Sequence, residues 1–465
     1  MSIPNMASSQ KAAPTIATGS SVARLAICLA AFCLVVAQPA RAQVLLRDVE
    51  IERWIDDYSL PIFYAAGLPA EQINILLIGD PTPNAFAGGL NMGIHTGLLT
   101  TADTPNQIAG VIAHEAGHIA GGHTARSDEA MAAATRPLLL SLVLAAGAAA
   151  AGAPQASIGL LGLGQNIGLA NALEFSRGQE ASADQAAITY LDRVGVSSRG
   201  LIEFFGKLRN FQVITGRRVN PYLQTHPLAT ERMTALRKRA EESPHYAKSD
   251  TTEDIFRLNM IQAKIKGFLQ EAKFTLREYP EADQSAPARY ARAVAYYRSA
   301  QIDPALAEIN SLLAEEPENP YFHELKGQML FEFGRIDDSI APHRQSVALA
   351  PDEALLRINL GRALIATEDK ARLPEAVEIL KSALALENDN ALGWFELARA
   401  HGGLGNLGHA HLATAESKYN GGAMGEAAQF ALRAQKEFKP GQPEYRRATD
   451  IIAAAKTAAA NRRRR

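Results

Sequence analysis

A repeat of 34 residues in the second half of the chain restricts its fold more than any other sequence feature. In a unit that starts at Pro320, Gly327, Gly334, Ser339 and Pro351 occupy the eighth, fifteenth, twentieth and thirty-second positions. Small residues at such positions let paired helices pack closely, and a proline ends the second helix of each pair. A period of this length is typical of helix pairs that stack into a solenoid.

Neighbouring segments fit the same frame. The matching residues are Ala293, Tyr296, Ala305 and Pro317 one period earlier, Leu360, Gly361, Ala376 and Ala383 one period later, and Leu397, Ala398, Gly405 and Ala410 after that. A three-residue insertion near 369–372 interrupts the frame, and 428–440 resembles a degenerate final unit. The set resembles the tetratricopeptide repeat, which implies an α-solenoid of helix pairs over residues 285–440, whereas an unrelated helical bundle would not repeat in this way.

The first 42 residues have the parts of a secretory signal peptide. Lys11 and Arg24 precede an apolar run at 25–36, and Ala-Arg-Ala at 40–42 offers a cleavage site before Gln43. The run is too short to cross a bilayer comfortably, so a retained membrane anchor is the weaker interpretation. The predicted location is the periplasm of a Gram-negative bacterium.

The positions of the cysteines and the balance of charge argue against cysteine chemistry and against a nucleic-acid partner. Cys28 and Cys33 are the two cysteines of the sequence, and both lie in the predicted leader, so the cleaved chain would have no disulfide, thiolate ligand or cysteine nucleophile. The 47 basic and 49 acidic residues nearly balance, which gives no reason to expect a nucleic-acid partner. The four arginines at 462–465 are interpreted as a solvated tail, with contact to anionic lipid as the alternative.

The sequence Val-Ile-Ala-His-Glu-Ala-Gly-His at 111–118 carries the predicted chemistry, on a helix that opens with a proline near its start. His114 and His118 lie four residues apart, so they project from one helix face and can bind the same metal ion. Glu115 can take a proton from a water on that ion and pass it to the leaving amine of a cleaved peptide. Surface histidines on an ordinary helix are the alternative.

A catalytic zinc needs a third protein ligand and an open position. The preferred ligand is Glu180 on a second predicted helix, where Asp184 shares its face and can accept the free ring N–H of one histidine. Glu174 is the competing carboxylate, but it lacks such a partner. His123 lies nine residues after His114, about half a turn out of phase, and is interpreted as a surface or capping residue. One zinc ion per chain is predicted.

An apolar stretch rich in alanine and glycine occupies residues 137–172. Each half is short and Pro154 separates the halves, so a transmembrane hairpin is a less favoured interpretation. We expect a buried or interface-covering pair of helices, and peripheral contact with a membrane surface is the alternative.

The His-Glu-Ala-Gly-His sequence, followed some sixty residues later by Glu180-x-x-x-Asp184, resembles the gluzincin arrangement of the M48 zinc metallopeptidases over roughly residues 45–240. The resemblance implies a zinc endopeptidase domain with a small sheet. Residues 73–79 have the pattern of a strand. The stretch at 84–98 is similar to the family's strand before the active-site helix, which implies substrate binding by β-augmentation.

Thr225-His226-Pro227 is similar to a further family segment, in which a histidine-proline pair approaches the active site. His226 could therefore approach the zinc, occupy its open position in a resting state, or help to stabilise the oxyanion. Alternatively, it is a loop histidine held by the turn that Pro227 imposes.

Together these features predict an α+β, mainly α protein with a signal peptide at 1–42, a metalloprotease domain at 43–250, a linker helix at 251–284, repeats at 285–440, and a C-terminal helix with a basic tail at 441–465. The combination resembles a group of periplasmic metallopeptidases that handles misassembled outer-membrane proteins. It implies an endopeptidase for misfolded or misassembled envelope proteins, whose repeats recruit substrate or the outer-membrane assembly machinery. The alternative is a chaperone or adaptor with a mostly latent peptidase site.

Overall fold

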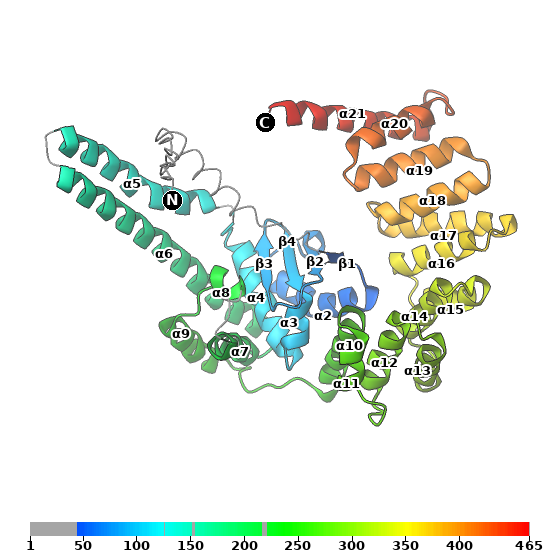
Figure 1. Ribbon diagram of the computed structural model, residues 1–465, viewed down its shortest axis with the longest axis horizontal. Helices are drawn as coiled ribbons and strands as arrows, with labels where there is room; N and C mark the ends of the chain where they lie inside the picture. Colours follow the sequence, from blue (N-terminus) through cyan, green and yellow to red (C-terminus); the bar gives the residue numbers. More distant parts are fainter. Residues whose placement is uncertain (1–43, 125, 151–153, 216–220, 465) are drawn as a thin grey trace, which may run out of the picture. The chain divides into compact units, whose positions relative to one another are not determined.

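A computed structural model of the protein describes residues 44–124, 126–150, 154–215 and 221–464. The predicted signal peptide at 1–42 lies outside the described residues. Figure 1 shows a small sheet among helices in the first half of the chain and a long series of helix pairs in the second half. The protein is therefore mainly α with a small sheet, as the sequence predicts.

The sheet has four strands in the order β1-β2-β4-β3. Its members are β1 (Leu45–Leu46), β2 (Asn74–Ile78), β3 (Ala85–Gly88) and β4 (Asn91–His95). The pairing of β2 with β4 is parallel, and the other two pairings are antiparallel. The strands expected at 73–79 and within 84–98 are present, and the strand order leaves β3 at an edge of the sheet.

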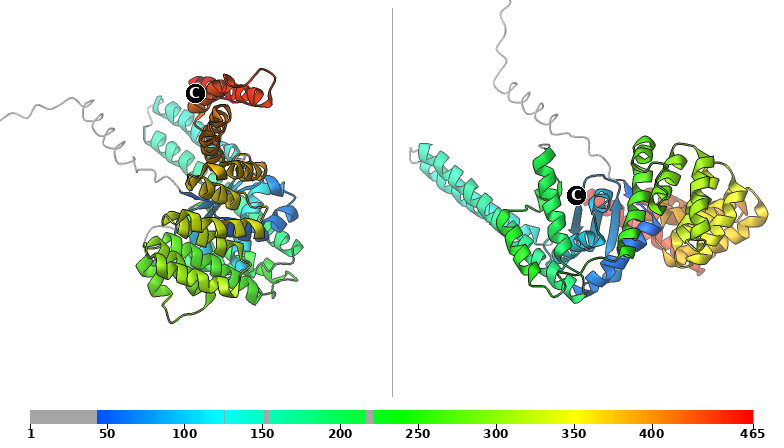
Figure 2. Two further views of the ribbon diagram at one scale, coloured as in Figure 1. Left: turned by 90° about the vertical axis from the view of Figure 1, so that its right-hand side faces the viewer. Right: turned by 90° about the horizontal axis from the view of Figure 1, so that it is seen from below.

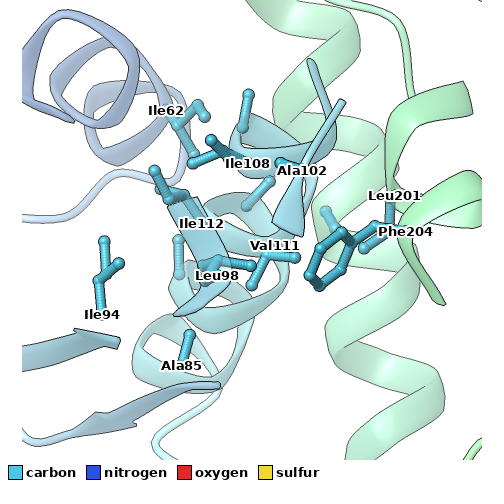
Figure 3. Close-up of a cluster of buried hydrophobic side chains, with 14 of the residues drawn as sticks. Ile62, Ala85, Ile94, Leu98, Ala102, Ile108, Val111, Ile112, Leu201 and Phe204 are labelled. Atoms are coloured by element: carbon cyan, nitrogen blue, oxygen red, sulfur yellow. The ribbon is translucent and has the colours of Figure 1, made fainter. Parts of the chain in front are cut away.

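Helix α4 (Pro105–Ala120) lies at the centre of this part, because all its residues from Pro105 to His118 are buried. Figure 3 shows Ile108, Val111 and Ile112 of α4 among apolar side chains of the sheet and of the neighbouring helices. The other helices here are α2 (Val49–Ala65), α3 (Thr96–Thr101), α5 (Ser127–Ala150), α6 (Pro154–Arg193), α7 (Arg199–Thr215), α8 (Pro221–Thr225) and α9 (Thr230–Glu241), with a 3₁₀ turn at Ala70–Gln72. A helix buried on every side is a fixed frame for the side chains that it carries.

The apolar stretch at 137–172 forms the facing parts of α5 and α6, which run antiparallel and side by side (Figure 1). Of the two expected arrangements, burial within the chain is wrong, and the covering of an interface stays a prediction. Most of their large apolar side chains are exposed, among them Leu140 at 62% and Val143 at 69%. The stretch is rich in small residues, so its two helices bury those against each other and leave the large side chains outside. Among the described residues, no helix is both long and apolar enough to cross a membrane.

The second half of the chain contains helices that follow one another in antiparallel pairs (Figure 1). After α10 (Thr252–Leu269) and α11 (Ala272–Glu278), the pairs are α12 (Ala286–Arg298) with α13 (Ile302–Glu315), α14 (Pro320–Glu332) with α15 (Ile336–Leu349), α16 (Ala354–Ala366) with α17 (Leu373–Leu386), α18 (Ala391–Gly403) with α19 (Leu407–Asn420), and α20 (Met424–Gln435) with α21 (Pro443–Arg464). These pairs have the arrangement that the tetratricopeptide-like period predicts.

The spacing of the pairs matches the sequence period. Helices α12, α14 and α16 begin at 286, 320 and 354, which are 34 residues apart, and α18 begins 37 residues later at 391. The three extra residues coincide with a short 3₁₀ turn at Lys370–Arg372. The glycines of the repeat allow the paired helices to pack closely, as expected. A Cβ at Gly327 would lie 2.7 Å from the His343 ring, and a Cβ at Gly361 would lie 2.7 Å from Leu380.

A buried ion cluster joins α10 to the beginning of α2. Lys264 is 2% exposed, and its Nζ lies 2.8 Å from Asp48 Oδ2 and 3.0 Å from Glu50 Oε2. The hydroxyl of Tyr290 on α12 donates a hydrogen bond of 2.7 Å to Glu50 Oε2. Burial opposes the charge of Lys264, but the neighbouring carboxylates raise its pKa well above the usual value, so the ammonium group stays charged.

We predict that Lys264→Met lowers the free energy of unfolding by about 3–5 kcal/mol, because it leaves buried carboxylates without their counter-charge. Urea denaturation followed by circular dichroism measures the change. Lys273→Met is the matched control, since Lys273 pairs with Glu271 at the surface and both side chains are 68% exposed. Equal stability of the Lys264→Met variant and the wild type would show that the cluster does not hold α10 to α2.

Candidate metal centre

Helix α4 presents the histidine pair and the glutamate of the first motif. His114, Glu115 and His118 are 0%, 1% and 9% exposed, which excludes the alternative of surface histidines on an ordinary helix. The Nε2 atoms of the two histidines lie 3.1 Å apart, so both can bind one ion. The helix phase expected from the sequence therefore brings the two rings together.

A close approach of α4 and α6 brings the second motif to the first. A Cβ at Gly117 would lie 2.9 Å from the carbonyl oxygen of Ala183, so a glycine is needed where these backbones meet. Glu180 and Asp184 flank this contact on α6. Glu180 Oε2 lies 3.4 Å from His114 Nε2, and Glu180 Oε1 lies 3.4 Å from Nε2 of His118. The competing carboxylate of Glu174 is exposed and does not belong to this group.

His226, directly after α8, completes the group. Its backbone N–H donates to the carbonyl oxygen of Tyr222 at 2.8 Å, and the centroids of the two rings are 4.6 Å apart. His226 Nδ1 lies 2.9 Å from Glu180 Oε1 and 3.5 Å from His114 Nε2. One ligand atom from each of His114, His118, Glu180 and His226 thus falls within 4.8 Å of the others.

This donor set fits a tetrahedral zinc ion. Zinc bonds of about 2.0–2.2 Å to nitrogen and oxygen place neighbouring ligand atoms of a tetrahedron about 3.3–3.6 Å apart. Five pairs of donor atoms in this group lie 2.9 to 3.5 Å apart, and the whole group falls within 4.8 Å. The charge also fits, because the site contains three buried carboxylates (Glu115, Glu180 and Asp184), of which Glu180 and Asp184 pair with the guanidinium of Arg232. With the histidines neutral, as metal binding requires, and the three carboxylates ionised, two negative charges remain, which a divalent cation would balance.

Asp184 and Arg232 hold the far side of the His114 ring. Asp184 Oδ1 lies 3.0 Å from His114 Nδ1, which directs the other ring nitrogen, Nε2, toward the ligand group. Arg232 on α9 donates from Nε and Nη2 to the two oxygens of Asp184 at 2.7 and 2.8 Å, and its Nη1 lies 2.8 Å from Glu180 Oε2. A bidentate pair of this kind fixes both carboxylates in position.

His123 is not a surface residue, contrary to the expectation from helix phase. It is 8% exposed, and its Nδ1 lies 2.8 Å from Nδ1 of His118. The phase argument assumes a continuing helix, but α4 ends at Ala120 and the chain turns at Gly122, where φ is +61°. That turn brings the His123 ring back to the nitrogen of His118 that faces away from Glu180.

The surroundings of the site shift the pKa values of its two motif histidines in opposite directions. Burial opposes a charge on His114, but hydrogen bonds to Asp184 and Glu180 raise its pKa to about 9. Burial, followed by the charge of His114, lowers the pKa of His118 to about 3. Burial also raises the pKa of Glu115, against the charges of His226 and His114, which suits a carboxylate that accepts a proton near neutral pH.

Two side chains of the site have no role assigned from the sequence. Arg232 lies in the segment that follows His226, and nothing in its spacing indicates that it meets Asp184. Tyr222 is 1% exposed, and burial together with the charge of Glu115 raises its pKa well above the usual value. Its position four residues before His226 is the one available signal, because it places both rings on the same side of a short helix.

Comparison with known proteins agrees with this geometry. Residues 48–240 match the model of peptidase family M48. The beta-barrel assembly-enhancing proteases of Yersinia pestis and Escherichia coli (strain K12) are 27% and 26% identical, and each alignment covers 87% of this chain and 83% or 82% of the relative. The metalloprotease LoiP of Escherichia coli (strain K12) is 32% identical over 36% of this chain and 61% of its own.

Among solved structures, the tetratricopeptide repeat protein YrrB aligns with 43% of this chain and 97% of its own. The identity is 18% and the TM-score is 0.32, which is too low to support a comparison of folds.

We predict that Asp184→Asn weakens zinc binding by about 10- to 100-fold, because the amide disrupts the contact with His114 and the pairing with Arg232. Competition with a chromophoric chelator measures the dissociation constant. Glu174→Gln is the control on the same helix and is expected to bind zinc like the wild type. Weak binding by Glu174→Gln together with normal binding by Glu180→Gln would overturn the ligand assignment.

Proposed function

We propose that the chain, whose residues 48–240 match the model of peptidase family M48, is a zinc-dependent endopeptidase of the bacterial periplasm that cleaves misfolded or misassembled envelope proteins. The observation that carries the proposal is the buried group formed by His114, His118, Glu180 and His226. Glu115 lies beside this group with its carboxylate buried. Three of these ligands and the adjacent glutamate are the parts that peptide hydrolysis by a zinc enzyme requires.

Each residue has a role in the proposed reaction. A zinc ion held by His114, His118 and Glu180 would supply Lewis acidity, which activates water and polarises the scissile carbonyl. Glu115 takes the proton of the attacking water and passes it to the leaving amine. Asp184 holds the His114 ring in the orientation that binding needs, and Arg232 holds Asp184.

The edge strand β3 is the proposed binding site for the substrate backbone. It packs against α4, which carries the catalytic motif, and only one of its sides pairs with β4. An extended peptide can add to such an edge through backbone hydrogen bonds, which accept many sequences. This mode of binding suits a protease whose substrates share an unfolded state rather than a sequence.

The cellular role rests on the relatives and on the repeats. Relatives that align with most of this chain are named beta-barrel assembly-enhancing proteases. We therefore infer that the substrates include outer-membrane proteins and that the helix pairs from α12 onward recruit substrate or the outer-membrane assembly machinery. The second candidate function is a chaperone or adaptor with a mostly latent peptidase site, which the closed group of four donors favours.

His226 is the proposed cause of that latency. Its Nδ1 lies as close to Glu180 and His114 as a fourth ligand does, so it would occupy the position that a catalytic zinc keeps open for water or substrate. The short helix α8 and the turn at Pro227 carry it, whereas the other three donors lie on the long helices α4 and α6. Its withdrawal would open the site without moving the other donors.

We predict that Glu115→Gln lowers the rate of casein cleavage by at least about 100-fold, because the amide cannot accept the proton of the attacking water. Zinc content and the thermal midpoint should match those of the wild type. Cleavage at the wild-type rate would contradict the assignment of Glu115. If this inactive variant still rescues envelope defects in cells, the binding role dominates over proteolysis.

We predict that His226→Ala raises the rate of casein cleavage several-fold and weakens zinc binding, because it removes a fourth ligand that blocks the open position. Both quantities are measured on the same preparation. His245→Ala is the control histidine, since it lies outside the ligand group. Unchanged or lower cleavage by His226→Ala would contradict the resting-state role, and lower cleavage would favour a role for His226 in stabilising the oxyanion.

A further inference from the structure

The hairpin of α5 and α6 exposes an apolar surface without charge. No Asp, Glu, Lys, Arg or His occurs between Pro137 and Leu173. The large exposed side chains of this segment are Leu138, Leu139, Leu140, Leu142, Val143, Leu144, Ile158, Leu163, Ile167, Leu169 and Leu173, with exposures between 38% and 74%. A soluble surface that carries so many neighbouring apolar side chains indicates a binding partner.

The exposed side chains surround most of α5. Successive residues of a helix are about 100° apart, so the exposed positions at 138–140 and 142–144 span about 240° of its circumference. Ser141 and Ala145 occupy the remaining sector, where they are 6% and 4% exposed. A protein groove covers one face of a helix, whereas a lipid environment covers every face that a neighbouring helix leaves free.

The packing inside the hairpin also differs from that of a water-soluble helix pair. Among the described positions of 137–171, those buried are small: Ser141 and Ala145 on α5, and Gly164 and Gly168 on α6. A Cβ at Gly164 would lie 1.9 Å from Ser141 Oγ and 3.0 Å from the Pro137 carbonyl oxygen, so the two backbones are close. Small residues between helices and large apolar residues outside are the arrangement found in lipid.

The dimensions fit one leaflet of a bilayer. From Ser141 to the end of α5 at Ala150, and from Gly164 back to the start of α6 at Pro154, each arm extends about 14–15 Å. Half of a hydrocarbon core of about 30 Å is about 15 Å. The exposed polar side chains of Gln165 and Asn166 lie at the Ser141 level.

Exposed Arg136 follows a little over one turn further from the tip, at a depth where a cation can meet lipid headgroups. We propose that the distal hairpin, formed by residues 141–150 of α5 and 154–164 of α6, inserts into one leaflet of a phospholipid bilayer and anchors the peptidase domain there. Helix α6 continues without a break to Glu180, about 24 Å beyond Gly164 along the helix axis. Insertion therefore holds the metal centre close to the membrane surface, within reach of proteins that are leaving or entering the bilayer.

Other occupants of this surface make different predictions. A second copy of the chain would cover one face of each hairpin and make the protein dimeric in the absence of lipid. Unfolded substrate would bind the hairpin in solution, so that changes in the hairpin would raise the KM for casein. Both alternatives can be measured beside binding to vesicles.

The test uses the full chain from Gln43 and vesicles of phosphatidylethanolamine and phosphatidylglycerol. This chain contains no cysteine, so Val143→Cys gives a single site for an environment-sensitive fluorophore. We expect the protein to float with the vesicles, and the fluorophore to shift to shorter wavelength and to be quenched by lipids brominated in their acyl chains. A fluorophore at Leu432→Cys on α20, where the native side chain is 50% exposed, is the control and should remain unquenched.

The partition into vesicles is compared between two double variants. Leu142→Lys with Val143→Lys changes two exposed residues of the inserted segment and should lower the partition by at least about 100-fold, because lysine in the hydrocarbon is strongly unfavourable. Leu407→Lys with Leu432→Lys changes two exposed leucines of α19 and α20 and should leave the partition unchanged. The two double variants and the two cysteine variants should all cleave casein at the wild-type rate in the absence of lipid, since none of the changed residues lies in the metal centre.

Several results would overturn the insertion. They are a failure of the wild type to float, equal partition of the two double variants, a dimer in solution that Leu142→Lys with Val143→Lys dissociates without any vesicle binding, and a raised KM for casein without vesicle binding. Flotation and quenching require no catalysis, so the Glu115→Gln variant should float with the vesicles and be quenched like the wild type. Absence of protease activity would therefore refute the proposed function and leave the membrane test unaffected.

Discussion

The metal centre depends on the close contact between α4 and α6, where the backbone of Ala183 lies against Gly117. A side chain larger than hydrogen at this point would push the helices apart and separate the histidine pair from Glu180 and Asp184. Neither motif suffices alone, because two histidines give an incomplete ligand set and two carboxylates give an uncompensated charge. The contact joins them inside a core that fixes α4 on all sides.

The charges around this contact form one connected group. Arg232 lies between Asp184 and Glu180, Asp184 contacts His114, and His123 contacts the other histidine of the motif, His118. Each ring that faces the ligand position therefore has a partner on its far side, which restricts its rotation. His226 also has a partner for its second ring nitrogen, because its Nε2 lies 3.7 Å from Glu115 Oε1. A backbone hydrogen bond to Tyr222 and a tilted contact between the two rings hold it as well. What distinguishes His226 is its place in the fold, because it follows the short helix α8 and can leave the site without movement of α4 or α6.

Helix α6 meets two different surroundings along its length. Toward Arg193 it packs into the peptidase core, with Ala187 and Leu191 fully buried. In its earlier part the buried positions among the described residues are Gly164 and Gly168, and most of the large apolar side chains are exposed. A continuous backbone links the two regions, so any constraint on the hairpin acts on the orientation of Glu180. One unbroken helix thus contributes both to the metal centre and to the exposed apolar surface of the hairpin.

The sequence alone determined the local parts of this protein. The 34-residue period specified the helix pairs, and the i, i+4 spacing of His114 with His118 and of Glu180 with Asp184 specified two helix faces, because such patterns depend on helix geometry over a few turns. Only the tertiary structure decided what surrounds those faces. Arg232, Tyr222 and His123 joined the site through a turn and through contacts between distant segments, and the hairpin proved to be exposed rather than buried. Spacing along a helix shows which residues share a face, but contacts across the fold decide what that face meets.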